Sequence, residues 1–198
     1  MPATTKLSTG RRGELLTLAC GLFAEKGFQA TTVRDIAEAA GILSGSLYHH
    51  FDSKETMVDE IIRSFQDELF AEYDAIMATN SGPREKLAAI IATSFESIHN
   101  HRDAVAIYQH ESKYLQQFDR FSYLIERNKQ YRDIVMSLLA EGVSEGVFRA
   151  DLDVEITYRF IRDSVWVAVG WYHPERGLAA SEIAERYLGI VLEGIARK

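Results

Sequence analysis

Apolar side chains recur along this chain three and four residues apart, the spacing that forms one face of an α-helix. Most of these patterns end at glycine, proline or small polar residues, which commonly stop helices. Alternating apolar and polar positions, the pattern of a half-buried strand, do not run to a useful length. The sequence therefore predicts an all-α protein of about nine helices, over residues 11–26, 32–40, 43–50, 54–79, 84–99, 103–117, 119–145, 154–172 and 181–196.

Residues 31–55 hold two short helical patterns that meet at a glycine. In the first, Thr32 and Asp35 have the spacing of a capping box, which starts a helix. Gly41 ends that helix, because glycine adopts at little cost the left-handed conformation that a sharp turn requires. The second pattern buries Leu47, with Phe51 four residues further on. This arrangement predicts a helix-turn-helix, whose second helix enters the major groove of DNA.

Polar and aromatic side chains occupy the other faces of this predicted motif. Hydroxyl groups, imidazoles and a phenol are suited to contacts with bases and phosphates. Lys54 follows Ser53, the expected cap of the next helix, and a cation beside the free N–H groups of a helix start is well placed for a phosphate. Each residue taken singly is more often a surface or packing residue. Together they predict the DNA-binding set Thr32, Ser44, Ser46, Tyr48, His49, His50 and Lys54.

The order of these residues resembles the signature of the TetR family of transcriptional regulators, which runs T-x-x-D/E-I-A, A-G, L-Y-x-H-F and S-K-E. The matching positions are Thr32, Asp35, Ile36, Ala37, Ala40, Gly41, Leu47, Tyr48, His50, Phe51, Ser53, Lys54 and Glu55. Leu43 and Ser44 depart from it, because the family usually has a Ser or Thr cap there, so the cap of the recognition helix stays open. The resemblance implies an N-terminal three-helix DNA-binding domain and a C-terminal helical domain for ligand binding and dimerisation. We expect them at residues 10–55 and 56–198, after a flexible arm at residues 1–9.

The formal net charge of −7 argues against nucleic-acid binding, which draws on Lys and Arg. Its distribution changes this picture, since residues 1–56 carry six basic and six acidic side chains and the excess negative charge lies beyond them. No stretch has the apolar length of a membrane span or the apolar centre of a signal peptide, so we expect a cytoplasmic protein without a membrane partner. The single cysteine, Cys20, has no partner for an internal disulfide and fits a small buried position in a helix.

The last two predicted helices are unusually apolar. The run VWVAVGWY, residues 165–172, is apolar on nearly every helix face, and such a helix must be covered on all sides. In a chain of this size, a partner subunit is the natural cover. The family resemblance implies a homodimer joined through a four-helix bundle of these two helices, with two recognition helices reading double-stranded operator DNA that is an inverted repeat.

The C-terminal domain of such a regulator is expected to bind a small molecule. Arg162 and Trp166 lie four residues apart on the most apolar helix, where a charge requires a partner. We expect Asp163 to pair with Arg159, which leaves Arg162 for an anionic ligand beside Trp166; an ion pair between subunits is the alternative. The further residues expected to line the site are Phe121, Tyr123 and Tyr108, each of which is more often plain core when taken alone.

Other segments resemble one group of TetR-type repressors, which control the later, bicyclic-ring stage of cholesterol catabolism in mycobacteria and rhodococci. These segments are RRGELL, GILSGSLYHHF, RFSY, and DLDV followed by YRFIRD and a Trp. The resemblance implies repression relieved by the coenzyme A thioester of a hexahydroindanedione propanoate. The chemistry is compatible, because a fused hydrocarbon suits aromatic side chains and a phosphate-bearing end suits arginines.

Three alternatives remain open at this point. The chain is compatible with a TetR-type regulator of other lipid or acyl-CoA metabolism, and with an activator instead of a repressor. A helical-bundle enzyme is disfavoured, because Glu96 and His99 form one E-x-x-H and the di-iron bundles need two. His99, His101 and His110 are a weak metal set without Cys, and no serine elbow or phosphate loop is found. We therefore expect no catalytic residue, no metal and no cofactor.

Overall fold

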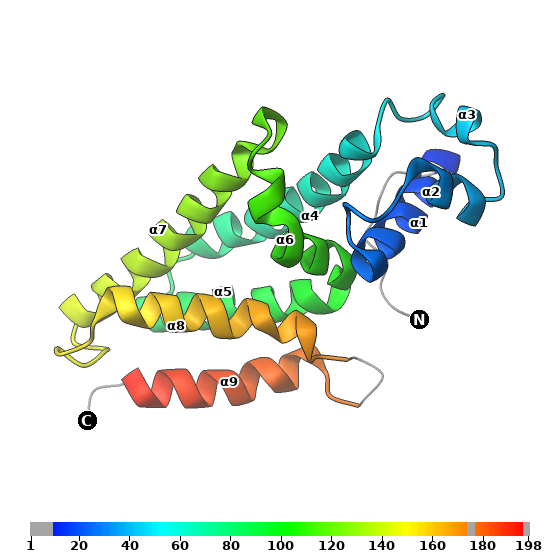
Figure 1. The fold of residues 1–198 in the computed structure, drawn as a ribbon. Coiled ribbons are helices and arrows are strands. Elements are labelled where there is room, and N and C mark those ends of the chain that lie inside the picture. Colours follow the sequence, from blue (N-terminus) through cyan, green and yellow to red (C-terminus); the bar gives the residue numbers. More distant parts are fainter. Residues whose placement is uncertain (1–9, 174–176, 196–198) are drawn as a thin grey trace. The chain divides into compact units, whose positions relative to one another are not determined.

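The computed structural model describes residues 10–173 and 177–195 (Figure 1). Within these ranges the chain forms nine α-helices and two short 3-10 helices and contains no strand, which confirms the predicted all-α fold. The arm predicted at residues 1–9 lies outside the described residues. The elements are α1 (Arg11–Lys26), α2 (Val33–Ala39), α3 (Ser44–Leu47), α4 (Lys54–Met77), α5 (Pro83–Asn100), α6 (Arg102–Leu115), η1 (Asp119–Phe121), α7 (Tyr123–Ser144), α8 (Val154–Trp166), η2 (Val167–Gly170) and α9 (Ala180–Ile195).

The helices form two compact units. The first comprises Met1–Glu68 and Asn100–Leu124, and so contains α1 to α3, the first part of α4, α6 and η1. The second comprises Leu69–His99 and Ile125–Lys198, which hold α8, α9 and most of α5 and α7. The domain boundaries expected at residues 10–55 and 56–198 stay a prediction. Among the helices described, none is long and apolar enough to cross a membrane.

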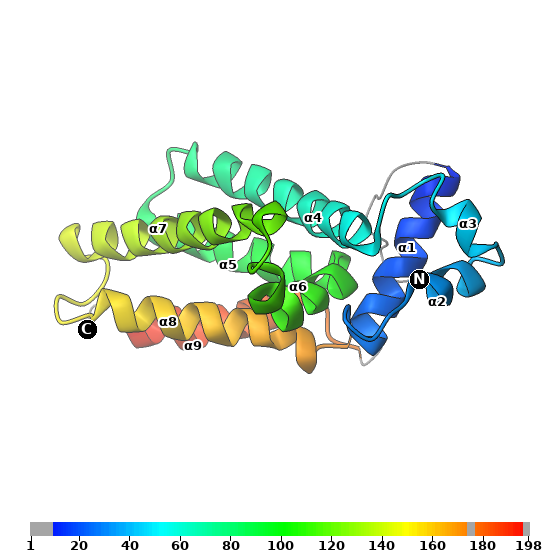
Figure 2. The ribbon, with the colours of Figure 1, turned by 45° about the horizontal axis from the view of Figure 1, so that its top comes forward.

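The core of the first unit gathers around α1. Leu15, Ala19 and Phe23 of α1 are almost completely buried, as are Ile36 of α2 and Leu47 of α3. Figures 1 and 2 both show α1, α2 and α3 gathered together. The apolar stripes read from the sequence therefore face one another and hold the helix-turn-helix in place.

Cys20 lies in this core, as expected, with a side chain that is 5% exposed. Burial raises the pKa of its thiol to about 12, and the negative charge of Asp103 acts in the same direction. The thiol therefore stays protonated at neutral pH, and a redox role for it is disfavoured.

Local capping rules place the helix ends of the motif correctly. Thr32 and Asp35 form the predicted capping box at the start of α2. Gly41 has a φ of 65°, the left-handed conformation expected after α2. The Ser53 hydroxyl accepts a hydrogen bond from the Thr56 N–H at 3.2 Å, which caps α4. Sequence and structure agree here because each cap depends on residues at most a few positions apart.

Three predicted helices are wrong in extent. The recognition helix, expected over 43–50, is α-helical only over Ser44–Leu47, and Leu43 at its N-cap provides no side-chain hydrogen bond. Residues 48–50 continue as turns, with the His50 N–H donating to the Leu47 carbonyl. The helix predicted over 119–145 begins instead with η1, and the one predicted over 154–172 passes from α8 into η2. In each case apolar periodicity continues through a tighter 3-10 or turn segment, which it cannot distinguish from an α-helix.

The second unit is built around buried aromatic side chains. Tyr73 is fully buried, and its hydroxyl is 2.6 Å from the Ser94 hydroxyl. The Tyr131 ring centroid lies 5.8 Å from that of Tyr73 and 6.2 Å from that of Trp166. These rings give the unit a core that also contains several hydroxyl groups.

The outer sides of α8 and α9 remain apolar and uncovered. Phe160 of α8 is 73% exposed and Ile190 of α9 is 77% exposed, and Val167 of η2 is also exposed. The two helices lie side by side, joined by a 2.7 Å hydrogen bond between the hydroxyls of Ser164 and Tyr187 (Figure 1). In a single chain, large apolar side chains on neighbouring helices therefore face solvent.

Candidate functional site

The helix-turn-helix has the division of faces that DNA reading requires. Leu47 and Phe51 are buried and fix α3 and the turn after it to the core. Tyr48 is 56% exposed, and His49 and His50 are exposed beside it. The predicted base-contacting residues Ser44 and Ser46 are half-buried on α3 itself. The apolar back and polar front are as predicted, while contact of these five polar residues with DNA stays a prediction.

Thr32 is fully engaged in the capping box. Its hydroxyl accepts from the Asp35 N–H at 3.1 Å and donates to Asp35 Oδ2 at 2.6 Å, and its own N–H donates to the same oxygen at 2.7 Å. These bonds lower the pKa of the Asp35 carboxyl group. Thr32 is exposed, so its predicted contact with DNA stays a prediction beside its established role as a cap.

Lys54 has a structural role that the sequence did not indicate. Its ammonium group donates to the carbonyls of Phe28, Gln29 and Thr31, at 2.9, 3.4 and 3.0 Å. It also lies 4.4 Å from the centroid of the Phe28 ring. An ammonium group has three donors, and three carbonyls occupy them. These contacts give Lys54 a role in holding the turn before α2, while its contact with a DNA phosphate stays a prediction.

Two further cations near the motif are also bound within the protein. Arg12 forms two hydrogen bonds to the carboxylate of Glu60, both at 2.5 Å, which raise its pKa, and lies 4.4 Å from the Phe51 ring centroid. Arg11 pairs with Glu14 at 2.9 Å and donates to the Ala40 carbonyl. These two arginines therefore fix α1 against its neighbours in the first unit.

On α8 the expected ion pairing is wrong. Arg159 pairs with Glu155 at 3.0 Å, not with Asp163. Asp163 pairs with its neighbour Arg162 at 2.6 Å, which raises the pKa of Arg162 and lowers that of Asp163. The i,i+4 rule applies to Glu155 and Arg159 just as well, and Arg132 of α7 also binds Glu155, at 2.6 Å. Arg162 is thus not left unpaired, although its side chain is still 42% exposed.

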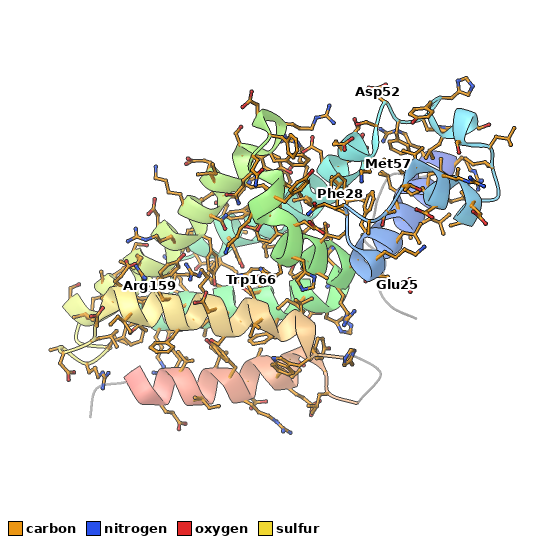
Figure 3. The ribbon with its side chains drawn as sticks, in the orientation of Figure 1. Glu25, Phe28, Asp52, Met57, Arg159 and Trp166 are labelled. Atoms are coloured by element: carbon orange, nitrogen blue, oxygen red, sulfur yellow. The ribbon has the colours of Figure 1, made fainter. Side chains whose placement is uncertain are left out.

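Arg162 and Trp166 belong to one aromatic cluster of the second unit. The guanidinium of Arg162 lies 5.5 Å from the centroid of the Tyr158 ring. Trp166 is 9% exposed, and its ring meets that of Tyr131 edge-on. The Tyr131 side chain is buried, and burial raises the pKa of its hydroxyl. Figure 3 labels Trp166 and Arg159 on α8.

The other three residues predicted to line the ligand site lie in the first unit. Phe121 of η1 is fully buried. Tyr108 is half-buried, with its ring centroid 6.4 Å from that of Phe65. The Tyr123 ring lies beneath the guanidinium of Arg63, at 3.8 Å, and burial raises the pKa of its hydroxyl. The predicted set is therefore divided between the two units, and its assembly into one site stays a prediction.

Two of the three histidines considered as metal ligands, His99 and His101, have other partners. His99 Nδ1 lies 2.8 Å from the Tyr172 hydroxyl, and His101 Nε2 lies 3.5 Å from a carboxylate oxygen of Glu68. Across the part of the chain that the structure describes, no three His, Cys, Asp or Glu side chains are grouped to hold a metal ion.

Comparison with known proteins identifies the family. Residues 15–61 match the bacterial regulatory proteins of the tetR family, and residues 80–195 match the tetracyclin repressor-like C-terminal domain. The transcriptional repressor KstR2 of Rhodococcus jostii is 54% identical over 192 residues, which cover 97% of this chain and 94% of that protein. The chain belongs to the TetR family.

It is therefore a TetR-type DNA-binding transcriptional repressor and not an enzyme. The structure of the ketosteroid transcriptional regulator KstR2 of Mycobacterium tuberculosis is 53% identical, with a TM-score of 0.94, covering 96% of this chain and 97% of that one. The structure of AibR in complex with isovaleryl coenzyme A and operator DNA is 22% identical, with a TM-score of 0.78, covering 91% and 97%. This second likeness shows the TetR fold.

Proposed function

We propose that this TetR-family repressor controls genes of cholesterol and steroid breakdown and leaves its operator when it binds a coenzyme A thioester of a steroid-ring fragment. The observation that carries the proposal is the 54% identity to KstR2 over nearly the whole chain. One KstR2 is named a ketosteroid transcriptional regulator, which supports a steroid-derived ligand. The AibR complex is a precedent for a coenzyme A thioester on this fold.

The aromatic cluster of the second unit has a chemistry suited to such a ligand. Trp166, Tyr131 and Tyr158 are buried aromatic side chains, and Arg162 lies over the Tyr158 ring with a partly exposed side chain. Arg162 uses Nε for Asp163, and a phosphate is a stronger competitor for the same group.

We further propose that the repressor acts as a homodimer. Phe160, Val167 and Ile190 present exposed apolar side chains on α8, η2 and α9. Burying this face against a second copy removes apolar surface from water. Two-fold symmetry then places the recognition helices on half-sites about 34 Å apart or more, so the operator is an inverted repeat. The protein acts in the cytoplasm, where the chromosome lies.

The experiment that tests this function is electrophoretic mobility of an inverted-repeat fragment from beside the protein's own gene. We expect a retarded complex, released by the coenzyme A thioester of hexahydroindanedione propanoate but not by free coenzyme A or palmitoyl-coenzyme A. Release by palmitoyl-coenzyme A would instead favour a regulator of fatty-acid metabolism. Hydrolysis of the thioester by the purified protein would contradict the assignment as a repressor without enzyme activity.

Two arginine variants provide the matched control for the ligand. Arg162→Ala should weaken binding of the bicyclic thioester by about tenfold, the usual effect of one lost charge-assisted hydrogen bond. Arg159→Ala removes the same charge from α8, but Arg159 lies against Glu155, whereas Arg162 lies over the Tyr158 ring of the cluster, so affinity should stay near that of the wild type. Equal effects of the two substitutions would show that only net charge matters.

The recognition residues are expected to separate into two kinds. Ser46→Ala should change which operator bases are preferred, because we place this half-buried hydroxyl on α3 against a base edge. Tyr48→Phe should weaken binding to all sequences by about fivefold, because the exposed phenol is placed at a phosphate. Selection from a randomised operator library, followed by affinity measurements, distinguishes the two. An unchanged base preference in Ser46→Ala would remove the base contact from this proposal.

A further inference from the structure

The turn that joins α1 to α2, residues 27–31, is held by side chains from other helices. Its backbone has left the helix, so its N–H and carbonyl groups need partners from elsewhere. Gly27 has a φ of 87°, and its N–H donates to the Phe23 carbonyl at 3.0 Å. The Thr31 N–H donates back to the Gly27 carbonyl at 3.2 Å. Side chains from distant parts of the chain bind the Phe28 N–H and three carbonyls of this turn.

Glu111 of α6 binds the turn on one side. The Phe28 N–H donates to Glu111 Oε1 at 3.0 Å, across 83 residues of sequence. Glu111 is only 9% exposed, an uncommon burial for a carboxylate, which needs such a donor. A Cβ atom at position 27 would lie 3.3 Å from the same oxygen, so the glycine there also leaves room for the carboxylate. Figure 3 labels Phe28, whose amide makes this contact with α6.

The first residue of α4 binds the same turn. Lys54 donates to the carbonyls of Phe28 and Thr31, at 2.9 and 3.0 Å, and its ammonium group lies over the Phe28 ring. That ring is also 6.3 Å, centroid to centroid, from the ring of Tyr114 on α6. All these residues belong to the first compact unit. The turn therefore has one anchor in α4 and one in α6.

We propose that Glu111 is a positioning residue for operator binding. By accepting from the Phe28 N–H it fixes the α1–α2 turn and hence the start of α2, whose cap Thr32 follows directly. Thr31 is fully buried and α2 packs against α3, so a displaced turn moves the recognition helix. Without an acceptor the buried N–H is unpaired, and the turn spends less time in its binding geometry. Operator affinity then falls in proportion to the fraction of molecules whose turn has the geometry needed for binding.

Glu111 would thus support operator binding from within the C-terminal family region, by positioning the α1–α2 turn. Glu111 lies outside the helix-turn-helix signature and within residues 80–195, which match the C-terminal domain. Helix α6 thus contributes to the function of the helix-turn-helix. The inference rests on operator binding, which the membership of the TetR family supports. It does not depend on which molecule is the effector.

The test uses the full-length protein with four substitutions. Glu111→Leu removes the acceptor, and Glu111→Asp keeps the charge but shortens the side chain; we expect both to weaken operator binding, by about tenfold for the Leu variant. Glu111→Gln keeps a side-chain carbonyl in the same place and should stay within about threefold of the wild type. Asp103→Ala removes a negative charge from the same helix as a control. Fluorescence anisotropy with labelled operator gives the affinities, and hydrogen exchange followed by NMR reports on the Phe28 amide.

Faster exchange at Phe28 together with weaker binding in the Leu and Asp variants, and rescue by Gln, would support the positioning role. Wild-type affinity in Glu111→Asp, or equal loss in Glu111→Gln and Glu111→Leu, would overturn it. If Glu111→Leu does not fold, the Asp and Gln variants decide in the same way. If the wild type fails to bind the chosen fragment, that fragment is not the operator. Unchanged exchange of the Phe28 amide in the Glu111→Asp variant would still refute the proposed role of the Glu111–Phe28 hydrogen bond.

Discussion

Phe160→Glu should convert the repressor to a monomer and weaken its operator binding by about a hundredfold. The side chain is 73% exposed in the single chain and lies on the apolar face of α8 that we assign to the dimer. A carboxylate there would lose its water on association and gain no partner, which costs several kcal/mol. Operator affinity falls when dimerisation is lost, because each DNA-binding domain then binds its half-site alone. Sedimentation and anisotropy, at one protein concentration, measure the two effects.

Ile125→Glu is the matched control for this prediction. Ile125 is also an exposed large apolar residue, at 57%, but it lies on α7 and not on the α8–α9 face. The same chemical change should therefore leave both the mass of the particle and its operator affinity unaltered. A Phe160→Glu variant that stays dimeric and binds normally would remove α8 from the interface.

The second large effect is expected at Gly142→Ala, which should lower the free energy of unfolding by about 3 kcal/mol. A Cβ atom at this position of α7 would lie 3.1 Å from Cγ of Phe148 and closer still to its Cδ2 and Cε2. Phe148 is 1% exposed, so its ring cannot move without disturbing the buried core. The amides of Val147 and Phe148 both donate to the Gly142 carbonyl at 2.9 Å, which holds the ring in place. Urea denaturation at fixed protein concentration measures the change.

Gly21→Ala provides the comparison within another helix. Nothing lies within 4 Å of a Cβ atom built at Gly21, so the substitution only reduces backbone freedom in α1. We expect it to stabilise the protein by about 0.5–1 kcal/mol. Destabilisation by both substitutions would mean that the Phe148 clash is not the cause.

Features that depend on neighbouring residues could be predicted from the sequence. The Thr32–Asp35 capping box, the left-handed Gly41 and the Ser53 cap each follow from local rules, and all three are present. The inner position of Leu47 followed from helical periodicity. These rules were sufficient for the fold and for the division of the recognition segment into an apolar back and a polar front.

Features that depend on the tertiary structure were missed or wrong. The structural role of Lys54 was missed, because nothing in the sequence indicates that the Phe28, Gln29 and Thr31 carbonyls converge on it. Glu111 carried no signal at all, since its partner is a backbone amide 83 residues away. On α8 the spacing rule permitted two partners for Arg159, namely Asp163 and Glu155. Arg159 pairs with Glu155, and Glu155 also binds Arg132 of α7.

The protonated, enclosed thiol of Cys20 has a practical consequence for spectroscopy. A cysteine placed on the exposed recognition surface, for example at His49, would be the one readily alkylated thiol in the folded protein. Maleimide dyes or spin labels can then be attached there without first replacing the native cysteine. Distances between two such labels in the dimer would report directly how far apart its heads lie, with and without bound effector.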